Sequence, residues 1–304
     1  MAKVKVGVIG CGKMGSFHSK ILKELAEAKL VGVFDEDKDK NKEVAERFGV
    51  RPYSSYELLL KDVDAVIIAT PTPTHFEIAK DAILCHKHVL IEKPLADSTA
   101  LAEELVSLSK NKNLKCSVGM IERFNPAFQK LLKMIKGQKI IGVDIKRLSP
   151  YPERIKESVI FDMMIHDIDL ALTLNRTKVE DLRAYGKKKR SETIDESYVT
   201  LYFKDGMIAK LDASRLKEQK ERKVTVTTEK GIYEADLLNK KLSVRSFDNL
   251  IEKSAEEVKN EDQLSLELRS FLLSIQKDRS PEVSLEDGLN SLKIAEEVEK
   301  TACS

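Results

Sequence analysis

The sequence has little of what marks secreted, metal-binding or membrane proteins. Tryptophan is absent from its 304 residues, and aromatic residues make up only 6% of them. The four cysteines are too far apart to suggest a zinc site, a redox pair or a disulfide framework: Cys11, Cys85, Cys116 and Cys303. No apolar run approaches the ~20 residues of a membrane-spanning helix, and the N-terminus lacks the apolar stretch of a signal peptide. We therefore expect a cytoplasmic protein with reduced thiols, no metal and no membrane partner.

An excess of either charge is also missing. Lys and Arg number 52 against 50 Asp and Glu, which gives a net charge of +2, and the two signs are interspersed. Nucleic-acid-binding proteins carry a basic patch or stripe, so we expect no nucleic-acid partner. What the chain does contain is 42% hydrophobic residues, enough for packed cores. Its length suits about two domains.

The most informative segment lies within the first fifteen residues. A predicted strand at 3–9 leads into three glycines at G-x-G-x-x-G spacing, and a helix is predicted at 16–28. In this setting the first glycine permits a tight turn, the second lets the backbone approach a phosphate, and the third lets helix and strand pack closely. The helix N-terminus adds unpaired N–H groups for the anion. The segment predicts a dinucleotide pyrophosphate site made of Gly10, Gly12, Lys13, Met14 and Gly15.

Strand and helix patterns alternate through the first 120 residues. Further strands are predicted at residues 30–34, 63–69, 89–91 and 115–118, and helices at 38–48, 75–85 and 99–110. This alternation predicts a parallel sheet with helices on both faces.

The pattern changes after Gly119. We predict a helix at 126–135, a strand at 140–148, an apolar helix at 160–174, strands at 179–186, 198–203, 207–214, 224–228 and 232–235, and helices at 261–276 and 285–300. Successive strands joined by short turns indicate an antiparallel sheet. The fold class is therefore α/β, with a dinucleotide-binding domain at 1–120 and an α+β domain at 121–304.

An acidic residue ends the second predicted strand. Asp35 lies twenty residues after Gly15, where a carboxylate can accept hydrogen bonds from both adenosine ribose hydroxyls. Glu36 and Asp37 would add to the repulsion of a 2′-phosphate. We therefore expect NAD rather than NADP. The alternative is that Asp35 only begins a solvated loop.

Two polar segments follow the next parallel strands, at the carboxyl edge where ligands bind in such folds. The first carries Thr70, Pro71 and Thr72 beside the cofactor. Its His75 faces either cofactor or solvent, or it is a helix-start histidine without function. The second is Glu92-Lys93-Pro94, in which proline stops the strand after the lysine. We expect Glu92 and Lys93 to lie beside the cofactor. Lys93 would point into the cleft, where it could polarise or deprotonate a substrate hydroxyl. Without that context it would be one of many surface lysines.

The apolar helix predicted at 160–174 carries a second polar group. Asp162 and His166 are four residues apart and so share one helical face, with Asp169 three residues further on. Histidine titrates near neutral pH, so the pair suits a proton relay. A core histidine satisfied by a neighbouring aspartate is the alternative. The pair does not suggest a zinc site, because no third potential ligand lies at a suitable spacing.

Taken together, these motifs resemble the Gfo/Idh/MocA family of oxidoreductases (glucose–fructose oxidoreductase, inositol dehydrogenase and their relatives). The resemblance covers nearly the whole chain and rests on 10–15, the Thr70-Pro71 turn, Glu92-Lys93-Pro94 and the stretch 162–167. It implies an N-terminal Rossmann domain, a C-terminal substrate-binding and oligomerisation domain with an open antiparallel sheet, and oxidation of a sugar or cyclitol CH–OH with NAD or NADP. It also implies a homodimer or homotetramer, and its catalytic positions match Lys93, Asp162 and His166.

A narrower resemblance concerns the substrate. Residues 121–127, 147–154 and 165–168 are similar to the UDP-N-acetylglucosamine 3-dehydrogenase branch of the family. On that basis an arginine would clamp a diphosphate, and the residues expected to bind substrate are Arg123, Asn125, Tyr151 and Arg154, together with Lys93 and His166. Arg123 and Arg154 could instead be structural or solvated. We favour His166 as the base, with Asp162 orienting it and Lys93 polarising the hydroxyl oxygen. Three alternatives stay open: an inositol or free-sugar dehydrogenase, a sensor of NAD or sugar without turnover, and an exchange of these roles between His166 and Lys93.

Overall fold

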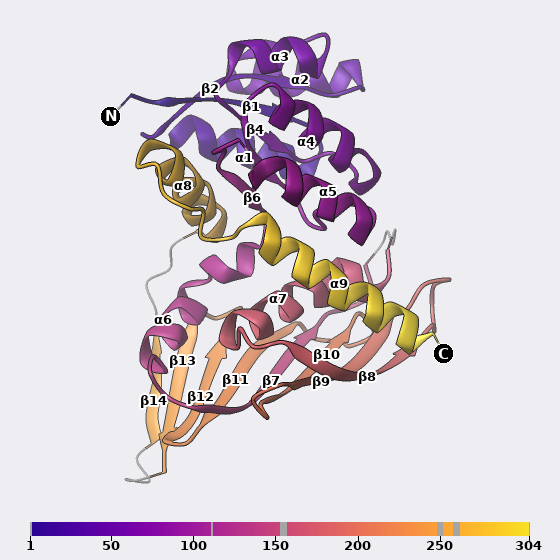
Figure 1. Ribbon diagram of the computed structural model, residues 1–304, viewed down its shortest axis with the longest axis vertical. Coiled ribbons are helices and arrows are strands. Elements are labelled where there is room, and N and C mark those ends of the chain that lie inside the picture. The colour runs from indigo at the N-terminus through magenta and orange to yellow at the C-terminus, as the bar shows by residue number, and fades with distance from the viewer. Residues whose placement is uncertain (1, 111, 153–156, 248–251, 258–261, 304) are drawn as a thin grey trace. The chain divides into compact units, whose positions relative to one another are not determined.

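The computed structural model describes residues 2–110, 112–152, 157–247, 252–257 and 262–303, and the chain forms two compact units (Figure 1). The first unit comprises Met1–Met120 and Asp262–Leu292, and the second comprises Ile121–Glu261 and Lys293–Ser304. The chain leaves the first unit after Met120 and returns to it at Asp262. The stretch 262–292 differs from the prediction, which placed all of 121–304 in the second domain.

The first unit is built on a parallel sheet in the order β3-β2-β1-β4-β5-β6. Its strands are β1 (Val4–Ile9), β2 (Ala28–Phe34), β3 (Arg51–Pro52), β4 (Ala65–Ile68), β5 (His88–Ile91) and β6 (Cys116–Val118). Each residue of β4 is buried, as the apolar run predicts for a strand covered on both faces. The chain order reverses between β1 and β4, so the carboxyl ends of these two strands form the crevice where ligands bind in doubly wound sheets.

Helices cover this sheet. They are α1 (Lys13–Glu24), α2 (Lys38–Phe48), α3 (Tyr56–Asp62), α4 (His75–Leu84), α5 (Thr99–Lys110) and α8 (Gln263–Gln276). A short 3₁₀ turn, Thr72–Thr74, precedes α4. The returning helix α8 contacts α1 and β1, which explains why 262–292 belongs to this unit. α2 begins where the Asp37 carboxylate accepts from the amides of Asp39 and Lys40.

The second unit contains an eight-stranded sheet in the order β14-β13-β12-β11-β7-β10-β9-β8. Its strands are β7 (Ile140–Leu148), β8 (Val179–Lys187), β9 (Glu196–Phe203), β10 (Ile208–Ser214), β11 (Glu221–Thr228), β12 (Gly231–Asp236), β13 (Lys241–Ser246) and β14 (Glu252–Glu257). All pairs are antiparallel except β7 with β10, which is parallel. The predicted antiparallel character is thus confirmed for most of the sheet.

Helices pack on one face of this large sheet (Figure 1). Helix α6 (Pro126–Met134) contacts β12 and β13, and α7 (Ile165–Leu174) contacts β7 and β10. A 3₁₀ turn, Ile121–Phe124, precedes α6, and a π-helical turn, Ile160–Met164, leads directly into α7. The last helix, α9 (Leu285–Ala302), contributes its first residues to the first unit and its remainder to the second.

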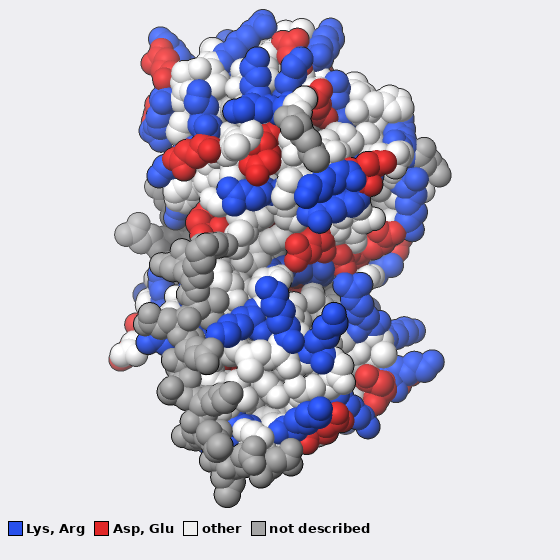
Figure 2. All heavy atoms as spheres, turned by 90° about the vertical axis from the view of Figure 1, so that its left-hand side faces the viewer, with Lys and Arg blue, Asp and Glu red and all other residues white. Residues whose placement is uncertain are grey.

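The surface agrees with the balanced composition. Figure 2 shows acidic and basic side chains close to one another over the face that it displays. Among the described residues, no helix combines the length and the apolar character needed to cross a membrane.

Candidate active site

The glycine turn between β1 and α1 has the geometry that its spacing predicts. Gly10 has φ +98, and a Cβ placed there would lie 2.5 Å from the carbonyl oxygen of Ala69. A Cβ on Gly15 would lie 1.8 Å from the carbonyl oxygen of Gly10. Any side chain at either position would therefore force the turn open or separate α1 from β1.

The same turn leaves room for a phosphate. A Cβ added to Gly12 would meet nothing within 4 Å, so the backbone at the start of α1 is open on that side. The first turn of α1 contains no acidic residue, and no side chain caps it. Its first N–H groups and the positive end of the helix dipole are thus available to an anion. Lys13 and Met14, the predicted neighbours of the cofactor, form this first turn. These residues fit the pyrophosphate of a dinucleotide.

Asp35 follows β2 at the edge of the glycine turn. Its Oδ2 accepts a hydrogen bond of 2.6 Å from the amide of Cys11, and its Oδ1 accepts one of 2.9 Å from the amide of Asp37. Because each carboxylate oxygen has a second lone pair, the group can still accept from a ribose. Burial, and next the charge of Asp35, raise the pKa of the Cys11 thiol to about 12. Cys11 is therefore a neutral packing residue and not a nucleophile.

The segment after β4 carries His75. This side chain is buried, and its two ring nitrogens lie 2.9 Å from the carbonyl oxygens of Pro94 and Thr70. It therefore faces protein and not solvent, as the alternative of a helix-start histidine without function predicts, because α4 begins at His75 and turns the ring inward. The Thr74 hydroxyl contacts Thr70 and the Pro71 carbonyl and makes no cap to α4. Pro71 is exposed, and Thr70 and Thr72 are half-buried.

Glu92 and Lys93 stand at the carboxyl end of β5, followed by a cis peptide to Pro94. Both side chains are half-buried. Glu92 accepts a 2.7 Å hydrogen bond from Nε2 of His18. His18 is fully buried on α1, three residues after Gly15. Sequence reasoning missed His18, although its short distance from the glycine turn was a usable signal.

A second glutamate lies near this pair. Glu267 of α8 is 2% exposed, and among the described residues neither of its carboxyl oxygens has a hydrogen-bond partner. Burial raises its pKa well above 4.5, and the charge of Glu92 raises it further. The sequence gives no sign of this proximity, because it arises from the return of α8 to the first unit.

The second unit holds the predicted proton-relay pair. Asp162 is exposed and lies in the π-helical turn, whereas His166 is half-buried at the start of α7. The prediction assumed one regular α-helix, but a π-helical turn closes with i→i+5 hydrogen bonds and is wider. Such turns occur frequently at functional sites. A spacing of four residues keeps the two positions on roughly the same side of this wider turn.

Two residues predicted to bind substrate have buried contacts that occupy them. The Arg123 guanidinium donates from Nε and Nη2 to the Asp169 carboxylate at 2.7 and 2.5 Å. Asn125 is buried, caps α6 through the amide of Ala127 and donates to Glu122 and to the Leu237 carbonyl. The Arg123 contacts correspond to the structural alternative, because a paired, buried guanidinium leaves little for a ligand. Asn125 uses its amide nitrogen for two contacts within the protein.

The two remaining candidates for substrate binding are Tyr151 and Arg154. Tyr151 is half-buried, and the Arg190 guanidinium lies 4.1 Å from the centre of its ring. That spacing is a cation–π contact, so Arg190 covers one face of the ring. Arg154 lies outside the described residues.

A buried charge network that sequence reasoning missed lies in the same unit. Arg147 donates to Glu122 at 2.9 Å and to Asp167 at 2.8 Å, and Arg222 donates to Glu122 at 3.1 Å. Burial raises the pKa of Glu122, but the charges of Arg147, Arg222 and His166 outweigh it, so that pKa falls to about 2. For Asp167, burial outweighs the charge of Arg147, and its pKa rises to about 6. Single charged residues in a strand and a helix gave no signal for this pairing.

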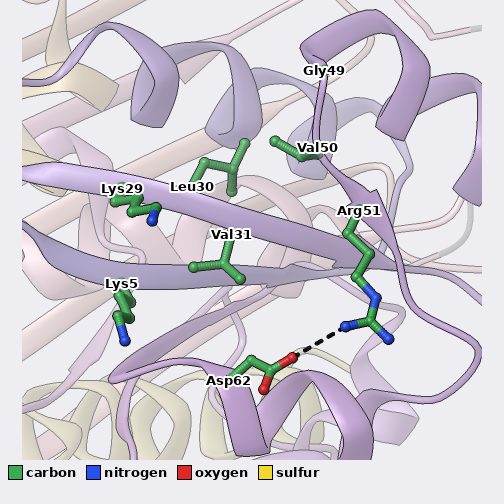
Figure 3. A pocket seen from close by; sticks show the side chains of 8 residues that line it. All are labelled: Lys5, Lys29, Leu30, Val31, Gly49, Val50, Arg51 and Asp62. Carbon is green, nitrogen blue, oxygen red and sulfur yellow. Dashed lines mark hydrogen bonds and ion pairs between the residues drawn. The ribbon is translucent and has the colours of Figure 1, made fainter.

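A pocket in the first unit lies away from the glycine turn. Figure 3 shows it at the start of β1 and β2, lined by Lys5, Lys29, Leu30, Val31, Gly49, Val50, Arg51 and Asp62. Arg51 and Asp62 form an ion pair of 3.4 Å across it. Since the glycine turn follows the opposite end of β1, this pocket is not the predicted cofactor site. In the described part of the chain no cluster of His, Cys, Asp or Glu could hold a metal ion.

Comparison with known proteins agrees with this geometry. A family model described as "Oxidoreductase family, NAD-binding Rossmann fold" matches residues 4–120, and one described as "GFO/IDH/MocA C-terminal domain" matches residues 144–234. UDP-N-acetylglucosamine 3-dehydrogenase of Acidithiobacillus ferrooxidans is 33% identical over 287 residues, which cover 92% of this chain and 91% of that enzyme. Myo-inositol 2-dehydrogenase of Thermotoga maritima is 28% identical over 321 residues, with coverage of 98% and 96%.

Solved structures show the same likeness in three dimensions. A crystal form of the Acidithiobacillus ferrooxidans enzyme superimposes with a TM-score of 0.94 at 31% identity and covers 99% of this chain and 98% of that one. A probable dehydrogenase from Thermotoga maritima superimposes with a TM-score of 0.86 at 27% identity, with coverage of 98% and 96%.

Proposed function

The chain belongs to the Gfo/Idh/MocA family of NAD-binding oxidoreductases, and we propose that it oxidises UDP-N-acetylglucosamine at C3 with NAD. One observation carries the choice of substrate, namely the 33% identity to UDP-N-acetylglucosamine 3-dehydrogenase over 92% of the chain. The choice of NAD over NADP is supported by the Asp35 carboxylate at the edge of the glycine turn, because a 2′-phosphate would be repelled there.

The residues that would hold the cofactor belong to the first unit. The open backbone at Gly12 and the N-terminus of α1 suit the pyrophosphate, and Asp35 suits the adenosine ribose. We place Thr70 and Thr72 near the nicotinamide end, since they follow β4 at the carboxyl edge. When bound, NAD accepts a hydride from the carbinol carbon of the substrate.

The proton chemistry is assigned to two side chains. We propose that His166 takes the hydroxyl proton, since an imidazole can accept a proton near neutral pH. Asp162 would orient the imidazole, and the Lys93 ammonium would polarise the hydroxyl oxygen and stabilise its developing negative charge. Tyr151 and Arg154 are proposed to bind the nucleotide part of the substrate. Arg123 and Asn125 are proposed to support the site from within, through their buried contacts.

Substitutions test these roles. Because general acid–base catalysis contributes ~10²–10⁴-fold, Lys93→Ala and His166→Ala should each lower kcat by about that factor while the Kd for NAD stays near that of the wild type. Wild-type turnover in either variant would refute its assignment.

A substrate panel separates the alternatives. NADH formation with UDP-N-acetylglucosamine but not with myo-inositol, scyllo-inositol or free sugars supports the proposal. Turnover of inositols alone favours an inositol dehydrogenase, a kind of enzyme to which the chain is also similar. Turnover of free sugars alone favours a free-sugar dehydrogenase. Binding of NAD without turnover of any panel member favours a sensor.

We further propose that the protein is a cytoplasmic homo-oligomer. All four cysteines are free thiols, which suits a reducing compartment. On the large sheet, Tyr185, Tyr198 and Ile208 are exposed, and their strand pairing places them on one face. Apolar groups gathered on one face suit self-association. Light scattering coupled to size exclusion would show a dimer or tetramer; a monomer at micromolar concentration would contradict the proposal.

A further inference from the structure

Two buried histidines contact the residues on either side of Lys93. His18 of α1 and His75 of α4 are 0% and 1% exposed. His18 contacts the side chain of Glu92, and His75 contacts the backbone carbonyl of Pro94. Neither has a part in the proton chemistry proposed above. All of these residues belong to the first unit.

His18 fixes the residue before Lys93. Its Nε2 lies 2.7 Å from Oε1 of Glu92, while Oε2 packs so closely on Gly119 that a Cβ there would lie 3.1 Å away. Burial raises the pKa of Glu92, but the hydrogen bond and charge of His18 and the charge of Lys93 outweigh it, and the pKa is lowered. Glu92 is therefore a carboxylate with one oxygen bonded to His18 and the other packed against Gly119. The contact ties the end of β5 to the helix that begins in the glycine turn.

His75 fixes the residue after Lys93. Its Nδ1 lies 2.9 Å from the Pro94 carbonyl oxygen, and its Nε2 lies 2.9 Å from the carbonyl oxygen of Thr70. The ring thus bridges the segments that follow β4 and β5, and each nitrogen serves a different segment. This division makes the two contacts separable by substitution.

We propose that His18 and His75 are positioning residues that fix the backbone on both sides of Lys93 and so hold its ammonium where it meets the substrate hydroxyl. The inference rests on the proposed role of Lys93. A lysine side chain has four rotatable bonds, so its ammonium can be held in one position only if the backbone that carries it is fixed. Misplacement of a reacting group by about 1 Å can cost ~10²-fold in rate.

Matched substitutions test this. Glutamine places its amide nitrogen near the position of Nε2, and asparagine places its own near Nδ1. His18→Gln therefore keeps the Glu92 contact and His18→Asn loses it. His75→Asn keeps the Pro94 contact, whereas His75→Gln keeps only the one to Thr70. We expect kcat within about 3-fold of wild type for His18→Gln and His75→Asn, and a loss of about 10–100-fold for His18→Asn and His75→Gln. KM and the Kd for NAD should stay within about 3-fold throughout.

A second readout does not depend on turnover. Hydrogen exchange of the amides of residues 92, 93, 95 and 96, followed by mass spectrometry, should be faster in His18→Asn than in His18→Gln, and faster in His75→Gln than in His75→Asn. Equal kcat for the two members of each pair, or kcat that follows only the melting temperature, would overturn the proposal. If the wild type itself turns over no substrate, the proposed function has failed, and equal exchange within each pair would then overturn the positioning role. The His18 variants change α1 and the His75 variants change α4, so either pair can test the proposal if the variants of the other pair do not fold.

Discussion

Replacing Glu267 by glutamine is expected to change how stability depends on pH. The Glu267 carboxyl is buried, and burial and the charge of Glu92 raise its pKa well above 4.5. In the folded protein the group therefore keeps its proton at pH values where the unfolded chain has lost it. Between the ordinary and the raised pKa the folded state binds more protons, so the free energy of unfolding falls as the pH rises. Above the raised pKa this contribution becomes constant.

The size of the effect follows from proton linkage. One proton bound only in the folded state changes the free energy of unfolding by about 1.4 kcal/mol per pH unit. For a domain of about 150–250 residues this corresponds to a shift in melting temperature of roughly 3–6 °C per pH unit. Glutamine has nearly the same shape and does not titrate. Between the ordinary and the raised pKa of Glu267, the free energy of unfolding of Glu267→Gln should therefore rise relative to that of the wild type by about 1.4 kcal/mol per pH unit.

Thermal unfolding of both proteins over a pH series measures the difference. Glu24→Gln is the matched control, since Glu24 is an exposed glutamate on α1, and its curve should run parallel to that of the wild type. Parallel curves for Glu267→Gln and the wild type would refute the reasoning, because they would mean that Glu267 binds its proton equally in both states.

Three further changes have defined outcomes. Asp169→Ala leaves the buried Arg123 guanidinium without its carboxylate and should destabilise the protein by about 3–5 kcal/mol in urea unfolding; a loss below about 1 kcal/mol would contradict the pairing. Asp35→Ala removes a charged acceptor and should weaken NAD binding by roughly 10–100-fold and NADP binding less, measured by cofactor titration; unchanged NAD affinity would speak against the ribose contact. Asp167→Asn should gain stability relative to the wild type as the pH rises from 3.8 to about 6, because asparagine cannot titrate and Asp167 has a raised pKa in the folded state; parallel stability curves for the two proteins would contradict this.

Elements with local signals were predictable from sequence. The bounds of α2 match the prediction, because Asp37 caps its first turn and Gly49, with φ +59, ends it. The hairpin at Gly206, with φ +90, also follows from its turn residues. By contrast α3 was missed, although Ser55 caps it, because seven residues give too little helical periodicity. Strands β13 and β14 were missed because most of their residues are charged or polar.

The site was predictable where chemistry is local and not where it depends on tertiary pairing. The glycine turn and Asp35 follow from spacing alone. The inward turn of His75 and the pairing of Arg123 with Asp169 join residues between 5 and 46 positions apart, and no single-sequence pattern marks them. The same applies to Glu267, whose helix returns from the far end of the chain to α1. Buried polar contacts of this kind decide which predicted residues remain free for a ligand.

The proposed reaction moves a hydride from C3 of UDP-N-acetylglucosamine to NAD. The most direct measurement uses UDP-N-acetylglucosamine carrying deuterium at C3, with mass spectrometry of the nicotinamide product. We expect the deuterium to appear in the reduced cofactor in step with oxidation of the sugar, and Lys93→Ala and His166→Ala to slow both together. Reduced cofactor without deuterium, or NAD binding with no reduction in the presence of any UDP-sugar, would contradict it.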